Sequence, residues 1–434
     1  MADVAPPLPR VVLMGLRRSG KTSIQKVVFE RTPPHETTFL QSTAKIQRTR
    51  VETSPFVQFQ IWDLVGQVDY TIEGTSATGA SGAPDLSSVL ENCGAVVFVL
   101  DCRVAMASPD PFKVHDFEQG TRRLVDTIVA VQHLNPAISV EIFLHKVDAL
   151  SEPVQMDLRR KVKNYVVEGV TARLGQQAAG GGAASGGNNS NSKLGHFGAA
   201  GGGGGGVHSS SAGAMASSSH VFVKVAYHLT SIFDHSVFEA FSHVVQKLMP
   251  QLSHVQSLLD MYVSNSGIAR SFLFDVSSKI YVARDTRPYD RNLYELCSDA
   301  VDLMKEFGQL YDHNDGPPRP GGDARASATT PTTTTTHQQP QGAALATTLD
   351  GGSSTAAATS SSSLEAMPAA VRSEEYIEVV LQDNVMLYLR SVCRSLTLVS
   401  VGPRDAFERG RPFIDFNISV FHRALVDMFG RALE

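Results

Sequence analysis

The 434-residue sequence has little cysteine, little tryptophan and little net charge. Its four cysteines, Cys93, Cys102, Cys297 and Cys393, are scattered singly, which excludes a disulfide framework and any metal-binding cysteine spacing. The formal net charge of −5 excludes the strongly basic class of chain that binds nucleic acid or anionic membranes in general. We therefore expect a chain from a reducing compartment, with no nucleic acid as a partner.

Long hydrophobic runs are also missing. No apolar run is long enough to cross a bilayer, and residues 1–4 carry no apolar signal region. Ala2 does not permit N-myristoylation, and residues 431–434 do not permit prenylation. We expect a cytoplasmic chain that reaches a membrane only through partners.

Three tracts lack the apolar residues needed for a packed core. Residues 71–83, 176–219 and 316–367 are rich in Gly, Ser, Thr and Ala, and the second contains six consecutive glycines. Such tracts bury too little apolar surface to offset the entropy of ordering, so they predict flexible surface insertions. The remaining chain predicts two domains, residues 10–250 and 251–434, after a flexible N-terminus of residues 1–9.

The most informative feature is the run from Gly15 to Thr22, which matches the phosphate-binding pattern G-x-x-x-x-G-K-[S/T]. Residues 11–14 predict a buried strand before it, and residues 24–29 predict a helix after it. In this context the glycines let backbone N–H groups close around phosphate oxygens. Lys21 is suited to the β- and γ-phosphates, and the Thr22 hydroxyl is suited to Mg²⁺.

A second motif begins where another predicted strand ends. Residues 59–63 form that strand, and Asp63 opens a D-x-x-G-Q pattern with Gly66 and Gln67. A carboxylate at the end of a strand can hold the metal, the Gly66 N–H can sense a γ-phosphate, and Gln67 can orient an attacking water.

A third motif follows the predicted strand at residues 140–144, as His145, Lys146 and Asp148. The Asp148 carboxylate could accept two hydrogen bonds from a guanine edge, which adenine cannot supply. Each motif is weak alone. Three in this order predict a nucleotide site at the carboxyl edge of a largely parallel sheet, since open α/β sheets bind ligands there.

Together these motifs resemble the Ras-like small GTPases, and within them the RagC/D-like subgroup of the Rag family. The resemblance is carried by residues 13–21, 25–29, 59–63, 145–148 and 229–236, and in the second half by residues 263–268, 272–276 and 294–297. It implies an α/β Ras-like P-loop GTPase domain followed by an α+β roadblock (longin-like) domain.

The resemblance also implies a set of site residues. It gives Thr43 a switch role that completes Mg²⁺ coordination; the alternative is an exposed loop hydroxyl. Catalysis is assigned to Gln67, and Mg²⁺ to Thr22, Thr43 and Asp63. Nucleotide contacts are assigned to Gly15, Arg17, Arg18, Ser19, Gly20, Lys21, Thr22, Ser23, Gly66, His145, Lys146, Asp148, Thr230, Ser231 and Ile232.

Two departures from the wider Ras pattern bear on the chemistry. His145 replaces the usual Asn, as in the Rag family, and can donate only one hydrogen bond to the phosphate loop. Arg17 and Arg18 occupy positions where Ras-like proteins usually carry Gly. Their bulk should obstruct an incoming arginine finger, so we expect slow hydrolysis.

The second half predicts the element order ββ–α–βββ–α after a connecting helix that begins near Leu252. The hairpin is expected within residues 271–283, a helix at residues 293–307, strands at 376–381, 385–389 and 396–401, and a final helix around 421–429. This half offers no catalytic geometry. It resembles the roadblock-type domain through which Rag proteins pair.

The resemblance implies a guanine-nucleotide switch that binds GTP or GDP with Mg²⁺ and hydrolyses GTP slowly. It further implies a heterodimer with a RagA/B-like subunit that relays amino-acid availability to the TOR kinase complex at the lysosomal or vacuolar membrane. A Ragulator-type scaffold, GAPs and exchange factors are the other implied partners. The alternative is a non-hydrolysing, nucleotide-stabilised scaffold subunit. Asp148 disfavours a P-loop ATPase.

Overall fold

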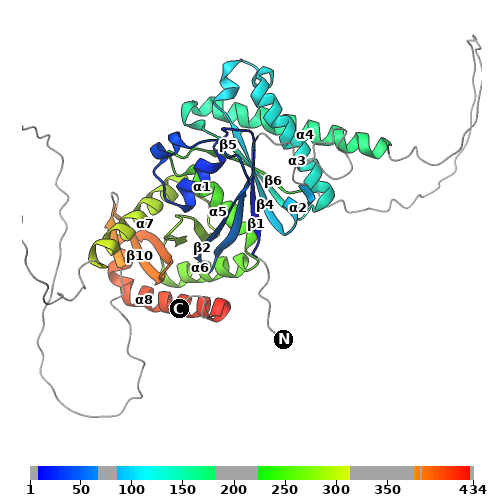
Figure 1. Ribbon diagram of the computed structural model, residues 1–434. Coiled ribbons are helices and arrows are strands. Elements are labelled where there is room, and N and C mark those ends of the chain that lie inside the picture. The colour runs from blue at the N-terminus through cyan, green and yellow to red at the C-terminus, as the bar shows by residue number, and fades with distance from the viewer. Residues whose placement is uncertain (1–7, 67–85, 181–222, 313–375, 382–383, 431–434) are drawn as a thin grey trace, which may run out of the picture. The chain divides into compact units, whose positions relative to one another are not determined.

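A computed structural model describes residues 8–66, 86–180, 223–312, 376–381 and 384–430 (Figure 1). The tracts predicted at residues 71–83 and 316–367 lie outside these residues, as does Gln67. Residues 176–180, at the start of the tract predicted at 176–219, are helical, and residues 181–219 lie outside the described residues.

The first sheet has six strands in the order β2-β3-β1-β4-β5-β6. Only the edge strand β2 is antiparallel to its neighbour, and the other pairs are parallel. This confirms the predicted parallel-dominated α/β fold. The strands are β1 (Arg10–Met14), β2 (Gln47–Ser54), β3 (Val57–Asp63), β4 (Cys93–Asp101), β5 (Ser139–His145) and β6 (Val225–Thr230).

Helices cover both faces of this sheet, which explains why its central strands β1, β4 and β5 are mostly apolar. On β1, Val11 and Leu13 join the core cluster that contains α1 and α5, while Val12 and Met14 join the cluster that contains α3 and α4. The helices are α1 (Lys21–Phe29), α2 (Leu86–Leu90), α3 (His115–Leu134), α4 (Glu152–Gly180) and α5 (Ser236–Leu248). The short 3₁₀ turns are η1 (Pro34–Phe39), η2 (Val104–Ala107), η3 (Pro111–Lys113) and η4 (Val147–Ala149).

The second sheet has five strands, all antiparallel, in the order β8-β7-β11-β10-β9. One of its faces packs on α7 and the other on α6 and α8. The elements are α6 (Leu252–Ser266), β7 (Arg270–Asp275), β8 (Tyr281–Arg284), α7 (Arg291–Asp312), β9 (Tyr376–Val380), β10 (Val385–Cys393), β11 (Leu396–Pro403) and α8 (Arg404–Phe429). The predicted order ββ–α–βββ–α is confirmed.

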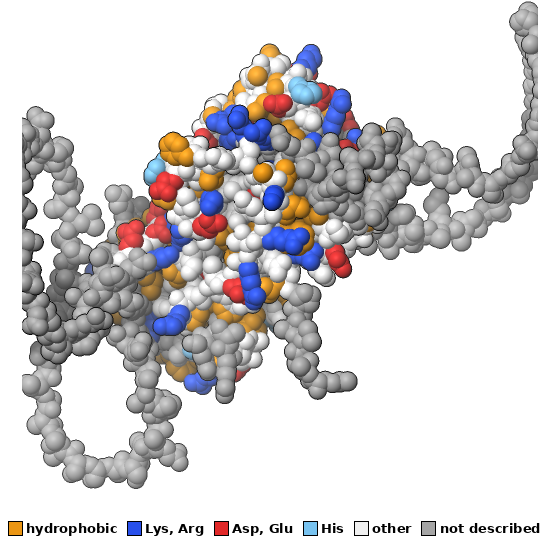
Figure 2. Space-filling view, in the orientation of Figure 1, with side chains coloured by type: hydrophobic (Ala, Val, Ile, Leu, Met, Phe, Trp, Pro, Cys, Tyr) orange, Lys and Arg blue, Asp and Glu red, His pale blue; other side chains and the backbone are white. Residues whose placement is uncertain are grey.

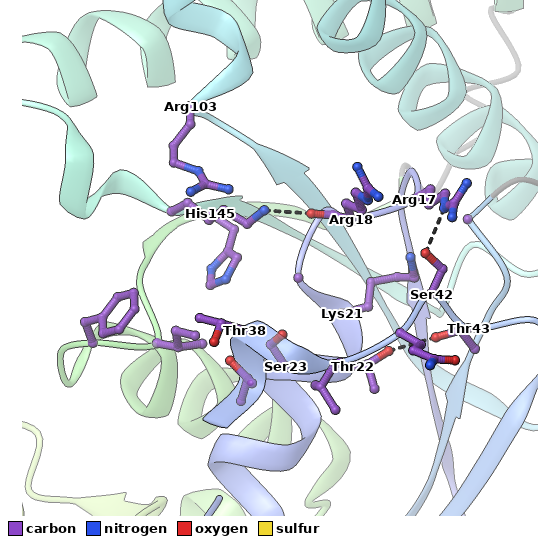
Figure 3. A pocket seen from close by; sticks show the side chains of 18 of the residues that line it. Arg17, Arg18, Lys21, Thr22, Ser23, Thr38, Ser42, Thr43, Arg103 and His145 are labelled. Carbon is purple, nitrogen blue, oxygen red and sulfur yellow. Dashed lines mark hydrogen bonds between the residues drawn. The ribbon is translucent and has the colours of Figure 1, made fainter. Parts of the chain in front are cut away.

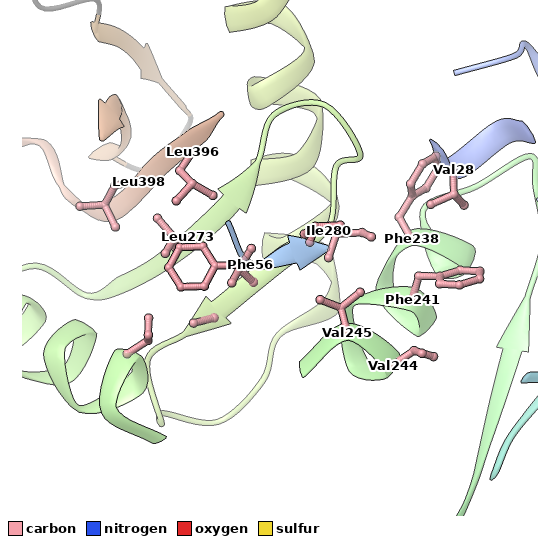
Figure 4. Close-up of a cluster of buried hydrophobic side chains, with 14 of the residues drawn as sticks. Val28, Phe56, Phe238, Phe241, Val244, Val245, Leu273, Ile280, Leu396 and Leu398 are labelled. Atoms are coloured by element: carbon pink, nitrogen blue, oxygen red, sulfur yellow. The ribbon is translucent and has the colours of Figure 1, made fainter. Parts of the chain in front are cut away.

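One apolar cluster joins the two sheets. Figure 4 shows Phe241 and Val245 of α5 in the same buried cluster as Leu273 and Ile280 from the second sheet. Polar contacts follow the same route, because the Tyr281 backbone N–H donates to Ser242 Oγ at 3.1 Å. The two sheets are therefore packed as parts of one core.

The described surface carries charges of both signs. On the face shown in Figure 2, Lys and Arg side chains are interspersed with Asp and Glu side chains. Among the described residues, no helix combines the length and the apolar character that a membrane span requires.

Candidate functional site: a phosphate-binding pocket at the carboxyl edge of the first sheet

The loop between β1 and α1 has the backbone shape of a phosphate cradle. Gly20 has φ 109°, and a Cβ there would lie 2.6 Å from His145 Cδ2, so only glycine fits. No side chain caps the start of α1, which begins at Lys21. The first N–H groups of the helix are thus available to an anion.

Lys21 is buried inside this loop. Its Nζ donates to the carbonyl oxygens of Gly15 and Leu16, both at 3.1 Å. Burial lowers the pKa of Lys21, Arg123 and Lys146 lower it further, and Asp63 opposes them. An ammonium held among other cations in this way is suited to an anionic ligand such as a phosphate.

Three oxygen side chains meet beside Lys21. Thr22 Oγ1 donates to Asp63 Oδ2 and lies 2.9 Å from Thr43 Oγ1, which is itself 3.3 Å from Asp63 Oδ2. Asp63 Oδ1 is buried without a hydrogen-bond partner, and burial raises the pKa of this carboxyl group. A carboxylate with one unpartnered oxygen, Oδ1, and with two hydroxyls on its other oxygen, fits Mg²⁺, which proteins commonly hold with one or two carboxylates plus the phosphates of a substrate.

No all-protein metal cage competes with this arrangement. Among the residues that the structure describes, no three His, Cys, Asp or Glu side chains are grouped to hold a metal ion. The set of two hydroxyls and one carboxylate is incomplete for Mg²⁺ by itself. The missing oxygens would have to come from water and from a bound phosphate.

His145 closes the other side of the loop. Its Nδ1 lies 3.1 Å from Thr230 Oγ1 and its ring packs on Gly20. Burial is the main cause that lowers the pKa of His145 to about 3, and the cation of Lys146 adds to it. The ring is therefore neutral at pH 7, and one of its two nitrogens is an acceptor.

Beyond His145 the pocket offers a carboxylate. Asp148 is exposed, and Ser231 Oγ donates to its Oδ1 at 2.7 Å. Ser231 is fixed in turn, because its backbone N–H donates to Ser236 Oγ at 2.8 Å. Lys146 links this end to the loop by donating to the Arg18 carbonyl oxygen at 2.6 Å.

These residues surround one open pocket of about 810 Å³. Figure 3 shows Thr22 and Thr43 on one side of Lys21 and His145 with Arg103 on the other. The predicted site residues that line the pocket are Arg17, Arg18, Gly20, Lys21, Thr22, Ser23, Thr43, Gly66, His145, Lys146, Asp148 and Ile232.

Other predicted residues lie behind the lining and hold it in place. Gly15 accepts from Lys21, Asp63 from Thr22, Thr230 contacts His145, and Ser231 donates to Asp148. Ser19 is buried behind the loop, and it does not line this pocket. The predicted catalytic residue Gln67 lies outside the described residues.

Sequence reasoning missed Arg103 and Ser42, which also line the pocket. Arg103 follows the end of β4, and that strand ends at the same sheet edge as the three motifs, so its position could have been found. Ser42 accepts a hydrogen bond from Arg17 Nε at 2.7 Å (Figure 3). No local pattern signals that contact, because it joins two loops.

Comparisons with known proteins agree with this geometry. Residues 10–180 and 207–301 match the family model described as the Gtr1/RagA G protein conserved region. The GTP-binding protein gtr2 of Schizosaccharomyces pombe is 36% identical over 302 residues, covering 70% of this chain and 75% of that protein. The human Ras-related GTP-binding protein C is 31% identical over 421 residues, covering 97% of this chain and 77% of that protein.

Among solved structures, Myxococcus xanthus MglB is similar over 43% of this chain and 95% of its own, but a TM-score of 0.24 at 12% identity is too weak to bear on the fold. The family match spans more than half of the chain and includes the loop, Asp63 and Asp148. The chain belongs to the Gtr/Rag family of GTP-binding proteins, among its Gtr2 and RagC/D-like members.

Proposed function

We propose that this chain is a guanine-nucleotide switch that binds GTP or GDP with Mg²⁺ and hydrolyses GTP slowly. The observation that carries the proposal is the meeting of Thr22, Thr43 and Asp63 beside the buried Lys21. Lys21 would hold the β- and γ-phosphates, and the three oxygen side chains would hold Mg²⁺, which supplies charge neutralisation on the phosphates.

Base selection would fall to Asp148. Its carboxylate is exposed to the pocket and is oriented by Ser231, while Ile232 lines the pocket beside it. A carboxylate accepts hydrogen bonds and cannot donate them, which suits the N–H groups of a guanine edge. His145 would support the phosphate loop from behind as a neutral ring, with Thr230 fixing its orientation.

Slow hydrolysis is proposed from the phosphate loop. Arg17 and Arg18 are both exposed at the pocket, and Arg17 already spans the gap to Ser42. An arginine supplied by a GAP would have to displace these side chains. Gln67 is proposed to orient the attacking water.

We also propose that residues 251–434 pair this chain with a RagA/B-like subunit. Within the described residues, β9 is hydrogen-bonded on one side only and forms an edge of the second sheet. Its side chains include Tyr376, 48% exposed, and Val380, 53% exposed. An edge strand with exposed apolar side chains is a template for a strand from another chain.

As the Rag-type subunit of such a heterodimer, the chain would relay amino-acid availability to a component of the TOR kinase complex. It would be cytoplasmic and would reach the lysosomal or vacuolar membrane through a Ragulator-type scaffold, with GAPs and exchange factors acting on its nucleotide. Membership of the Gtr/Rag family supports this part of the proposal.

The test starts from the full chain co-expressed with a RagA/B-like subunit. Mass spectrometry of the purified complex should find GTP or GDP and the partner, and single-turnover assays should detect slow phosphate release that Gln67→Leu abolishes. Bound ATP would refute the base assignment. Tight GTP binding with no phosphate release would favour the non-hydrolysing scaffold.

A further inference from the structure

Gly66, of the D-x-x-G-Q motif, lies directly on the phosphate loop. A Cβ on Gly66 would clash with the backbone nitrogen of Arg17 and the carbonyl carbon of Leu16. Gly66 also lines the nucleotide pocket. Backbone is thus packed against backbone at the place where a third phosphate would meet the loop.

A side chain from a different element holds Gly66 there. Arg123, in the middle of α3, donates from an Nη atom to the Gly66 carbonyl oxygen at 2.9 Å. Arg123 is half-buried, whereas its neighbour Arg122 is exposed and pairs with Glu118 at 2.6 Å. Two adjacent arginines of one helix therefore have different surroundings: one reaches the nucleotide site and the other faces solvent.

Arg123 also belongs to a group of cations beside the phosphate loop, because it lines a neighbouring pocket together with Arg17, Arg18 and Lys146. Positive charge gathered there favours a ligand that carries an additional negative charge, as a γ-phosphate does. Arg123 thus holds the Gly66 backbone in position and adds positive charge near the loop.

We propose that Arg123 is a positioning residue that makes this site discriminate GTP from GDP. By holding the Gly66 carbonyl oxygen, it places the Gly66 backbone over the loop before the nucleotide binds, so the γ-phosphate meets an ordered N–H donor. GDP has no γ-phosphate and gains nothing from that placement. This inference rests on the proposed function, because it requires a guanine-nucleotide site.

The test compares Arg123→Gln with the matched control Arg122→Gln in the full chain. Radiolabelled GTP is photo-crosslinked to this chain in the presence of competing GDP or GTPγS. The labelled chain is then separated from any partner by size, and the loss of label gives the two affinities. Hydrogen bonds to charged groups are among the stronger ones in proteins, so Arg123→Gln should lower the GTPγS-to-GDP affinity ratio by about tenfold or more. Arg122→Gln should leave both affinities unchanged.

Arg123→Lys supplies the conservative variant, because its ammonium can still donate to the Gly66 carbonyl oxygen. Arg123→Lys should restore most of the wild-type GTPγS-to-GDP affinity ratio. If Arg123→Gln does not fold, Arg123→Lys is the variant that is compared with the wild type. The proposal is overturned if Arg123→Gln weakens both nucleotides equally or neither, or if Arg122→Gln causes the same loss. A wild-type chain that binds no guanine nucleotide would instead refute the proposed function.

Discussion

The two sheets of this molecule bury their cores in similar ways but present their polar groups differently. In the first sheet, parallel strands end at one edge, so Asp63, His145 and Thr230 come together although they are far apart in sequence. In the second sheet, neighbouring strands run in opposite directions and their polar ends alternate between two edges. There, the Oδ1 atom of the buried Asp275 accepts hydrogen bonds from the backbone N–H and the hydroxyl of Ser278, three residues away.

The difference teaches where each half can act. A parallel sheet collects strand ends into one polar pocket, which can hold a charged ligand. An antiparallel sheet covered by helices leaves its outer strand as the surface on which another chain can pair. We therefore expect that a single substitution in one half changes either nucleotide choice or partner binding, but not both. A substitution that removes a contact between the two sheets should lower the stability of both.

The largest effect on one half alone is expected from a substitution at Asp148. Asp148→Asn should lower GTP affinity by about 10⁴-fold, because a site built for two N–H donors is left mismatched, and it should favour a xanthine nucleotide. Partner binding should not change. Titration with GTP, ATP and XTP checks this, with Asp157→Asn on α4, outside the pocket, as the control. Equal affinity for ATP and GTP in the wild type would contradict it.

At the edge of the second sheet, we expect a substitution to change partner binding and to leave nucleotide affinity unchanged. Val380→Asp should weaken binding of the proposed RagA/B-like subunit by about 30-fold, roughly 2 kcal/mol, because the proposed interface would desolvate a charge in place of an apolar side chain. Nucleotide affinity should stay the same. Val167→Asp on α4 is the matched control, since Val167 is 55% exposed and Val380 is 53% exposed. Co-purification and light scattering measure the loss, and equal loss in both variants would reject this edge as the interface.

A substitution at Arg31 tests whether the two sheets unfold together in one cooperative transition. Arg31 follows α1, and it donates to the carbonyl oxygens of Ser277 at 2.6 Å and Val276 at 2.9 Å, beside the second sheet. Arg31→Gln should lower the free energy of unfolding by about 2 kcal/mol, because two charge-assisted hydrogen bonds are lost. The exposed Arg50→Gln should not. Urea unfolding followed by Trp62 emission reports on the first sheet, and an unshifted Trp62 transition would show that the sheets unfold independently.

The smallest effect is expected at His145 and depends on pH. Burial lowers its pKa to about 3, so between pH 6.5 and 3 the unfolded chain binds a proton that the folded chain refuses. Stability therefore falls as pH falls through this range. His145→Asn should reduce that fall by up to about 1.4 kcal/mol per pH unit. Burial also lowers the pKa of His243 to about 4, so the part of the pH dependence that His243 causes should remain in this variant. Unfolding curves at pH 7, 6 and 5 measure the slope, and an unchanged slope would contradict a buried neutral His145.

Much of the fold could be predicted from local patterns. In the first sheet, β1, β4 and β5 are largely continuous apolar runs and could be recognised as strands. The edge strand β2, with the polar sequence QRTRVETS, and β6 at the opposite edge were not predicted. In the second half, the strand and helix patterns gave the order of the elements. The last helix was predicted only around residues 421–429, whereas α8 begins at Arg404. Gly410 and Pro412 disfavour helix locally, and packing of Phe407 and Ile414 into the core outweighs that preference.

The part of the site that lies at the ends of parallel strands could be predicted, because those strands end at the same edge of the first sheet. Lys21, Asp63 and Asp148 could be placed near one pocket on that basis, and Thr43 only through the family resemblance. Their roles stay predictions. The contacts of Arg17 with Ser42 and of Arg123 with Gly66 could not be predicted, because each joins segments that carry no pattern relating them.

The core shared by the two sheets has a consequence for synthesis of the chain. The cluster that contains Phe241 also contains Ile280 and, from the last helix, Phe421 and Leu425. A growing chain that has completed the first sheet therefore still exposes an apolar surface until α8 has been synthesised and packed. The second half supplies core that the first half lacks, and nascent chains should need protection from aggregation until then.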